Sequence, residues 1–274
     1  MSKVIIVTGA SSGIGKATAL QLIKEGHTVY GAARRVQKMQ DLVSAGGNAI
    51  AMDVCNHEQV HNQIQKIIEN EGKIDVLVNN AGYAVYGPVE EINYEQAKRQ
   101  FDVNLFGLAE VTKAVLPTMR NQKSGTIINI SSVGGKIYTP LGAWYHATKH
   151  ALEGWSDCLR LEIKQFGIDV VIVEPGAIKT EFDQAMDQQF GKTTGPYASL
   201  KKTMEKVMAN AYKPGNYSEP TVIAETISKA IHSKNPKTRY AAGKMAKQTL
   251  MGRKWLSDKG FDKMIMRMIK NFEK

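Results

Sequence analysis

The sequence is poor in cysteine and lacks long apolar runs. Cys55 and Cys158 are the only cysteines, and their spacing matches no metal-binding or redox motif. Reduced thiols are typical of the cytoplasm, so we expect a cytoplasmic protein. No run approaches the roughly 18 apolar residues of a membrane span. Met1-Ser2-Lys3 leads directly into an apolar segment, which leaves little room for a targeting leader.

Internal repeats, low-complexity linkers and clusters with metal-ligand spacing are also missing, so we expect one domain over residues 1–274 and no metal. Hydrophobic residues make up 43% of the chain, which is ample for a sizeable core. The net charge of +10 invites a nucleic-acid partner. However, residues 234–274 hold twelve basic and three acidic residues, and the remainder is nearly neutral. We therefore expect no nucleic acid as a partner.

Apolar strand candidates alternate with helical stretches along most of the chain. Such alternation, with helices of ten residues or more, indicates βαβ units and a parallel sheet. We therefore predict an α/β fold built on a single doubly wound parallel sheet, the Rossmann fold, with a C-terminal helical extension. The predicted strands are Val4–Val7, Thr28–Tyr30, Ala49–Met52, Ile74–Asn79, Thr126–Ile130 and Asp169–Val173, and the predicted helices are about Val36–Ser44, Glu58–Asn70, Tyr94–Met119 and Ala143–Phe166.

Two segments depart from this alternation. Residues 180–220 are punctuated by glycine and proline, and they follow a predicted strand at the edge where open α/β sheets bind ligands. A stretch of this length is usually functional, so we expect a substrate loop or lid. Residues 243–274 form a basic tail, for which we expect a helix.

The helical tail has an apolar stripe of Phe261, Ile265, Met268 and Phe272 beside a basic face. A basic amphipathic helix can lie on an anionic membrane. We favour packing of the stripe across the substrate cleft or onto a partner subunit, because a methionine-rich stripe with acidic neighbours binds membranes less well than a tryptophan-rich one.

A glycine-rich turn follows the first predicted strand, and residues 16–24 after it have the composition of a helix. A strand, such a turn and a helix form a phosphate cradle, because glycines let the backbone approach an anion and the first N–H groups of the helix face it. The spacing G-x-x-x-G-x-G fits the general dinucleotide fingerprint only loosely, and a purely structural turn is the alternative. The candidate residues are Gly9, Ser11, Ser12, Gly13, Ile14 and Gly15.

Tyr145 and Lys149 form a second motif, with Tyr145 placed 13 residues after Ser132. On a helix their side chains would lie one turn apart on the same face. An ammonium near a phenol favours the phenolate and lowers the tyrosine pKa from about 10. The tyrosine can then exchange a proton with an alcohol or carbonyl oxygen. The motif is weak evidence alone, because both residues are common on helix surfaces.

Together with Asn79-Asn80-Ala81-Gly82 and Pro175-Gly176, these motifs resemble the short-chain dehydrogenase/reductase family over roughly residues 3 to 240. The pattern is most similar to the branch related to 17β-hydroxysteroid dehydrogenases. The resemblance implies hydride transfer between a nicotinamide cofactor and an alcohol or carbonyl group. The family's catalytic residues match Asn104, Ser132, Tyr145 and Lys149.

The resemblance implies a role for each catalytic residue. Tyr145 is the general acid in reduction and the general base in oxidation. Lys149 lowers the pKa of Tyr145 and bonds the nicotinamide ribose, and Ser132 stabilises negative charge on the substrate oxygen. Asn104 holds a water that connects Lys149 to solvent; an asparagine that only bonds to backbone is the alternative.

We expect NADP rather than NAD as the cofactor. An NAD site usually has a carboxylate about 20 residues beyond the glycine turn, whereas Arg34-Arg35 follow the second strand here and the first carboxylate is Asp41. Guanidinium groups pair with a 2′-phosphate; two solvated arginines are the alternative. Other cofactor contacts implied by the resemblance are Asp53, Val54, Asn80, Ala81, Gly82, Tyr145, Lys149, Pro175, Gly176, Ile178 and Thr180, with helix capping as the alternative for Asp53 and Thr180.

The prediction is therefore an NADP-dependent oxidoreductase that interconverts a ketone or aldehyde and an alcohol; the alternative is a dinucleotide-binding redox sensor without turnover. Apolar and aromatic residues near the motifs favour a hydrophobic substrate of lipid, steroid, retinoid or aromatic type, although core packing could explain them. These residues are Tyr83, Val85, Tyr86, Ile137, Tyr138, Leu141, Trp144, Phe182, Met186 and Phe190.

Family members commonly pair through long helices, so we expect a homodimer or homotetramer. Leu152, Trp155, Leu159 and Ile163 form an apolar stripe on the helix that carries Tyr145. A face packed against the sheet explains this stripe equally well.

Overall fold

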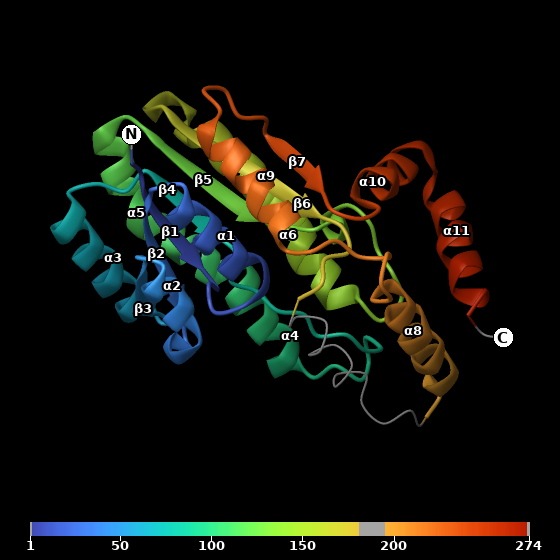
Figure 1. Cartoon of the computed structure of the whole chain (residues 1–274). Coiled ribbons are helices and arrows are strands. Elements are labelled where there is room, and N and C mark those ends of the chain that lie inside the picture. The colour runs from blue at the N-terminus through green and yellow to red at the C-terminus, as the bar shows by residue number, and fades with distance from the viewer. Residues whose placement is uncertain (1, 181–194, 273–274) are drawn as a thin grey trace.

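A parallel sheet runs through the centre of the computed structural model, which describes residues 2–180 and 195–272. Its strands lie in the order β3-β2-β1-β4-β5-β6-β7, and each neighbouring pair is parallel. The predicted doubly wound sheet is confirmed (Figure 1). The strands are β1 (Val4–Thr8), β2 (Thr28–Ala33), β3 (Asn48–Ala51), β4 (Val76–Asn79), β5 (Gly125–Ile130), β6 (Ile168–Pro175) and β7 (Arg239–Ala242).

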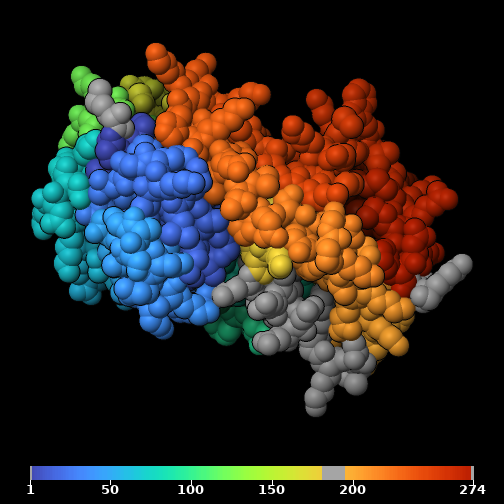
Figure 2. All heavy atoms as spheres, viewed as in Figure 1, coloured from blue at the N-terminus to red at the C-terminus, as the bar shows by residue number. Residues whose placement is uncertain are grey.

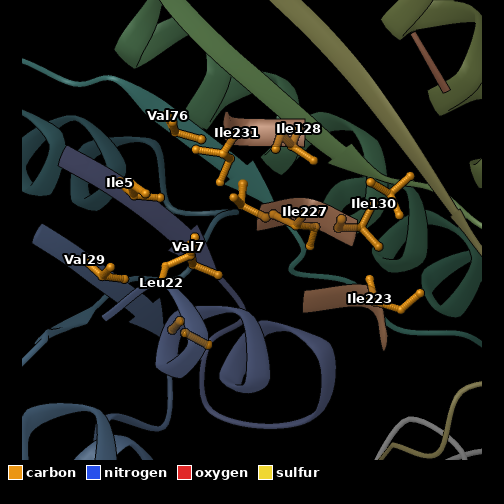
Figure 3. Close-up of a cluster of buried hydrophobic side chains, with 14 of the residues drawn as sticks. Ile5, Val7, Leu22, Val29, Val76, Ile128, Ile130, Ile223, Ile227 and Ile231 are labelled. Atoms are coloured by element: carbon orange, nitrogen blue, oxygen red, sulfur yellow. The ribbon is translucent and has the colours of Figure 1, made fainter. Parts of the chain in front are cut away.

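One face of the sheet is covered by α1 (Gly13–Lys24), α2 (Gln40–Ser44) and α9 (Thr221–His232). Figure 3 shows isoleucine side chains of α9 next to isoleucine and valine side chains of β1, β4 and β5, with Leu22 of α1 nearby. All five residues of β1 are buried, as expected for a central parallel strand that is covered on both faces. This packing fixes the carboxyl ends of the strands relative to the start of α1.

The opposite face is covered by α3 (His57–Glu71), α5 (Leu108–Gln122) and α6 (Ala143–Ile163). Leu152, Leu159 and Ile163 of α6 are buried and Trp155 is half-buried. The predicted stripe therefore packs inside the subunit, and it provides no support for an oligomer interface.

A buried polar network ties this face to the sheet. The amide of Asn79 donates to Thr112 Oγ1 (2.9 Å) and Asn129 Oδ1 (3.0 Å), and the amide of Asn129 donates to Ser156 Oγ (2.9 Å). Partnered polar groups inside a core hold their elements in one arrangement. Here they fix β4, β5, α5 and α6, the elements that lead to the site.

The long helix predicted over Tyr94–Met119 consists of three parts. They are α4 (Tyr94–Phe101), a π-helical stretch (Asp102–Gly107) and α5. A capping box starts α4, with Asn93 accepting from the backbone of Gln96 and the Gln96 side chain accepting from that of Asn93. The π-helical stretch contains Asn104, and such bulges are frequent at functional sites.

The C-terminal third contains more regular structure than predicted. The segment expected to be a loop from 180 to 220 contains a 14-residue helix, α8 (Ala198–Ala211), so the prediction was wrong for this part. β7 was also missed. Within the described residues, no helix has the length and apolar character needed to cross a membrane.

The basic tail forms two helices, α10 (Ala246–Trp255) and α11 (Asp258–Lys270), rather than one. Figures 1 and 2 show them at the end of the molecule that lies away from α2 and α3. Phe261, Ile265 and Ile269 are the buried residues of α11, whereas Met268 is exposed. The predicted stripe was therefore wrong at Met268, because Ile269, four residues after Ile265 and so one turn further on the same face, takes the buried position.

Candidate active site

A cavity of about 750 Å³ lies at the carboxyl ends of the central strands. It contains most of the residues that the sequence singled out, although they come from distant parts of the chain. The predicted residues that line it are Gly9, Ser11, Ser12, Gly13, Ile14, Arg34, Arg35, Asp53, Val54, Asn80, Ala81, Gly82, Ser132, Tyr145, Lys149, Pro175, Gly176, Ile178 and Thr180. Gly15 and Asn104 lie outside the lining.

The backbone conformation and close packing of the glycine-rich turn require glycine at three positions. Gly9 and Gly13 have φ angles of +68° and +54°, in the left-handed region that favours glycine. A Cβ on Gly15 would lie 2.4 Å from both Asn80 Nδ2 and Gly9 O. Ser12 is the N-cap of α1 but makes no capping hydrogen bond through its side chain. The turn and the first N–H groups of α1 thus fit a pyrophosphate.

Asn80 and Thr8 join this turn to the end of β4. The Asn80 amide donates to Thr8 O (3.0 Å) and Gly9 O (3.3 Å). Thr8 Oγ1 accepts from the backbone N–H groups of Asn80 and Ala81, each at 3.0 Å. The two loops therefore meet at the point where the strand order reverses, which is where open α/β sheets bind ligands.

Arg34 and Arg35 are exposed side chains at the end of β2, and both line the cavity. Arg35 Nη2 lies 3.4 Å from the hydroxyl oxygens of Ser11 and Ser12, so this guanidinium covers the glycine turn. The described hydrogen bonds join Arg35, and not Arg34, to the turn. Together the two side chains place positive charge beside the cradle.

Asp53 lies at another point on the cavity wall. Its carboxylate accepts from Cys55 N (3.0 Å) and lies 3.4 Å from Arg99 Nη2. The cap of α3 is Asn56, whose side chain accepts from Gln59 N. The capping alternative for Asp53 is therefore wrong, and its carboxylate faces the cavity beside a cation.

Tyr145 and Lys149 are both buried on α6 at the cavity wall. Lys149 Nζ donates to Ile130 O (2.9 Å) at the end of β5. Complete burial lowers the pKa of Lys149 to about 8, although the carboxylate of Glu153 opposes this shift. The ring of Tyr145 lies 5.6 Å from that of Tyr86. A lysine with this pKa can hold or release a proton near neutral pH.

Ser131 and Ser132 both line the cavity after β5. Ser132 Oγ accepts from Gly134 N at 3.0 Å, which leaves its hydroxyl proton available to a ligand. Ser131 Oγ is buried and has no hydrogen-bond partner within the described chain. The sequence favoured Ser132 on spacing alone, and the cavity contains two neighbouring hydroxyls.

Asn104 is buried behind the cavity. Its amide donates to Tyr83 O (2.8 Å) and Thr148 Oγ1 (3.1 Å), and its Oδ1 accepts from Tyr83 N (3.0 Å). These contacts hold the loop after β4 against α6. Both amide protons are used, so Oδ1 alone keeps a free lone pair for the water that we predicted.

An acidic network lies behind Lys149. Arg239 of β7 donates to Glu153 (3.0 Å) and Asp157 (2.6 Å) and lies 3.8 Å from Glu174. Lys136 pairs with Glu153 at 3.0 Å. Burial, together with repulsion from Glu153, raises the pKa of Glu174 to about 6. Arg239 of β7 therefore offsets the charge of Glu153 and Glu174, two carboxylates that are buried beneath the site.

Beyond Tyr145 the surroundings become apolar. A buried cluster contains Tyr145 together with residues of the loops after β4 and β5, of α8 and of α11: Ala84, Tyr86, Ile137, Leu141, Met204, Phe261, Ile265 and Ile269. Tyr138 belongs to its edge, where its ring meets Phe261 at 5.1 Å and its hydroxyl donates to Asp262 at 2.9 Å. The tail thus packs onto this end of the site, as favoured from the sequence.

Several predicted substrate residues have other positions. Tyr83 and Tyr86 line the cavity, but Trp144 packs edge-on against Phe101, with ring centres 6.5 Å apart. Val85, Ile137, Tyr138 and Leu141 are also absent from the lining, because they pack in or around the core. Phe182, Met186 and Phe190 lie outside the described residues.

Arg99 and Tyr212 line the cavity and were not predicted. Arg99 lies on α4 and Tyr212 follows α8. No local motif marks either residue, since each reaches the cavity only through the packing of its helix. The Asp53–Arg99 pair is the one signal that could have been sought, as an opposite charge for a carboxylate near the cofactor.

Glu25, His27 and His232 come together at the other edge of the sheet, with potential ligand atoms within 4.8 Å of one another. No spacing in the sequence indicates this group. His27 Nδ1 accepts from Lys3 N (3.3 Å), so a neutral His27 carries its proton on Nε2, which is then a donor. Ser228 donates to the Glu25 carboxylate. We interpret the group as a link between α1 and α9 and assign no metal to it.

The chain belongs to the short-chain dehydrogenase family, whose model, described as short chain dehydrogenase, matches residues 3–190. It is 36% identical over 260 residues to a 3-ketodihydrosphingosine reductase of Bacteroides thetaiotaomicron, covering 93% of this chain and 94% of that one. A solved short-chain dehydrogenase from Streptomyces avermitilis is 34% identical, with a TM-score of 0.81 and coverage of 100% and 97%.

A solved serine dehydrogenase complexed with NADP⁺ is 27% identical, with a TM-score of 0.76 and coverage of 86% and 92%. Similar structures hold NADP in some cases and NAD in others. The protein is therefore an oxidoreductase of a family that uses a nicotinamide dinucleotide. The narrower resemblance to the 17β-hydroxysteroid dehydrogenase branch stays a prediction.

Proposed function

We propose that the protein is an NADP-dependent enzyme that interconverts a ketone or aldehyde and an alcohol on a hydrophobic substrate. The observation that carries this proposal is the cavity itself. It joins the glycine turn and two arginines to Ser132, Tyr145 and Lys149, and an apolar cluster extends from Tyr145. When bound, the nicotinamide cofactor supplies or accepts the hydride.

The chain's own residues handle the proton and the developing charge. Tyr145 gives its phenolic proton to the carbonyl oxygen in reduction and takes it back in oxidation. Ser132 donates a hydrogen bond to the same oxygen, which is worth about 3 kcal/mol in comparable sites. Lys149 in its charged form favours the tyrosinate, and Asn104 fixes the loop that faces them. Gly9, Gly13, Gly15, Asn80 and Asp53 shape and line the dinucleotide end.

Tyr145→Phe tests the reaction. The variant keeps the ring and removes the proton, so turnover should fall by about 10²–10⁴-fold while the cofactor still binds. Activity near that of the wild type would refute the assignment. Cofactor binding by the wild type without turnover on any ketone or alcohol would favour a redox sensor instead.

The preference for NADP rests on Arg34 and Arg35. Charge-assisted contacts to a 2′-phosphate contribute about 1.5–3 kcal/mol, which is roughly a tenfold to hundredfold preference. Fluorescence titration with NADPH and NADH measures it. Arg34→Asp and Arg35→Asp should each shift the preference toward NADH, whereas Arg120→Asp, on the exposed side of α5, should not. Equal dissociation constants for the wild type would contradict the proposal.

The apolar cluster beside Tyr145 supports a hydrophobic substrate. The Bacteroides relative is named a 3-ketodihydrosphingosine reductase, so we propose that ketone as the first substrate to assay, followed by a panel of steroid, retinoid and aromatic ketones. Exclusive activity on small charged ketones would contradict this class. We also propose a homodimer or homotetramer, which light scattering tests; a monomer mass at working concentration would refute it.

A further inference from the structure

The outer face of α10 carries both apolar and basic side chains. Met251 and Trp255, one turn apart, are 61% and 80% exposed. Lys247 and Lys254 lie on the same face, at four residues before and three residues after Met251, and both are exposed. The opposite side packs inward, where Ala246 is buried. Trp255 is the most exposed of the large hydrophobic side chains described.

α11 continues this surface. Its inward face is complete, because Phe261, Ile265 and Ile269 are buried in the apolar cluster next to Tyr145. Its outward side leaves Met266 and Met268 exposed, at 41% and 53%, among lysines and an arginine. We define the α10–α11 surface as the exposed residues Lys247, Met251, Lys254, Trp255, Lys259, Lys263, Met266, Arg267, Met268 and Lys270.

The charge of this surface selects its partner. Residues 243–272 contain eight basic residues and two acidic ones, Asp258 and Asp262. Asp258 is paired with Arg253 at 2.6 Å, and Asp262 accepts from Tyr138. A second copy of the chain would bring the same positive surface to the contact, so like charges would oppose that pairing. The complementary partner is anionic and also has an apolar phase for Trp255 and the methionines.

We propose that the α10–α11 surface docks on an anionic lipid bilayer, with Trp255 and Met251 inserted at the interface and the lysines against the headgroups. Tryptophan prefers the level of the headgroups, where its ring is half in the apolar phase. Basic residues near an anionic bilayer each strengthen binding about fivefold. Phe261 and Ile265, the first half of the stripe predicted from the sequence, do not take part in this docking, because the protein already buries them.

The α10–α11 surface lies next to the substrate end of the site, so docking would bring that end close to the bilayer. On its inner side α11 packs on the apolar cluster that contains Tyr145, a residue of the cavity wall, and there the ring of Phe261 meets that of Tyr138. Figure 2 shows α10 and α11 together at one end of the molecule. A docked enzyme would take an apolar ketone from the bilayer at this end. This consequence rests on the proposed function, whereas docking itself is measured without turnover.

Sedimentation with vesicles tests the inference on the full chain. Phosphatidylcholine vesicles that contain phosphatidylglycerol should bind the protein, pure phosphatidylcholine vesicles should not, and added salt should weaken binding. Trp255→Ala/Met251→Ala should lower the partition coefficient at least tenfold. Lys247→Glu should lower it by roughly 25-fold, because it changes the charge by two. Melting temperature and cofactor binding should stay unchanged in both variants.

Matched controls lie elsewhere on the protein. Leu161 on α6 is 75% exposed, and Lys66 on α3 is exposed, so Leu161→Ala and Lys66→Glu should bind vesicles like the wild type. Absence of sedimentation, or equal loss in the controls, would overturn the proposal. Loss with Lys247→Glu but not with the Trp255/Met251 variant would also overturn it, in favour of a soluble polyanion. A change of oligomeric mass in the latter variant would identify a subunit interface instead.

Discussion

Arg239→Met should destabilise the fold although the residue lies outside the cavity. Arg239 neutralises Glu153 and Glu174, whose side chains are only 3% and 5% exposed. Methionine keeps the apolar stem and removes the charge. Lys136 then remains as a partner, and its described contact is with Glu153 alone. Breaking a buried ion pair by removing one member costs about 3–5 kcal/mol, and we expect a loss of that size near pH 8.

The pH dependence provides a second readout for the same variant. The pKa of Glu174 is raised from 4.5 to about 6. Between these values the folded state binds more protons, so this group contributes about 2 kcal/mol of stability at low pH, which is lost as pH rises through 6. Without Arg239 the Glu174 pKa should rise further. The deficit of the variant should therefore be largest near pH 8 and smallest near pH 5.

Urea unfolding followed by circular dichroism at both pH values measures these free energies. Lys98→Met is the control, because Lys98 forms an exposed helix pair with Asp102, and this variant should unfold at nearly the same urea concentration as the wild type. Arg239→Met/Glu153→Gln should recover part of the loss by removing one buried charge. A deficit below about 1 kcal/mol at pH 8, or one that does not change with pH, would refute the reasoning.

Three further predictions use other parts of the structure. The reduction rate should fall as pH rises through about 8, where Lys149 loses its proton, and a pH profile of kcat/KM that stays flat there would argue against a charged Lys149. Gly15→Ala should abolish tight cofactor binding, which titration measures, because the added Cβ would collide with Asn80 and Gly9. Gly154→Ala, in open space on α6, should instead stabilise the folded protein by about 0.5–1 kcal/mol, which calorimetry measures. Truncation after Ala242 should lower the free energy of unfolding by roughly 5 kcal/mol in plain buffer, because the contribution of the three buried side chains of α11 is lost. An unchanged melting temperature would show that α11 contributes nothing to stability.

Most residues that the sequence proposes for dinucleotide binding line the cavity, because their signals in the sequence are local. The glycine turn, the Arg34-Arg35 pair and the Tyr145–Lys149 spacing each lie within one short segment and depend on one backbone geometry. The sheet could be predicted for a similar reason, since buried parallel strands are continuously apolar. β7 was missed because Arg-Tyr-Ala-Ala is short, has a charged residue and lies at the sheet edge.

The substrate half could not be predicted from local patterns. Trp144 immediately precedes Tyr145 in the sequence, but its position on α6 turns its ring toward Phe101. Tyr212 reaches the cavity because α8 packs against α11. α8 itself was hidden by flanking glycines and prolines that suggested a loop. Each of these outcomes depends on contacts between elements, and a propensity or a spacing carries no information about them.

The packing of α11 on the cluster around Tyr145 also sets an order of events during synthesis. Tyr138 and its partner Asp262 are separated by 124 residues. A ribosome therefore completes the glycine turn, the arginines, Tyr145 and Lys149 long before it makes α11, the helix that packs on the cluster around Tyr145. Contacts of such separation close late in folding. The nascent chain acquires every group of the dinucleotide half first, and its apolar end stays open to chaperones or to lipid until the last two helices emerge.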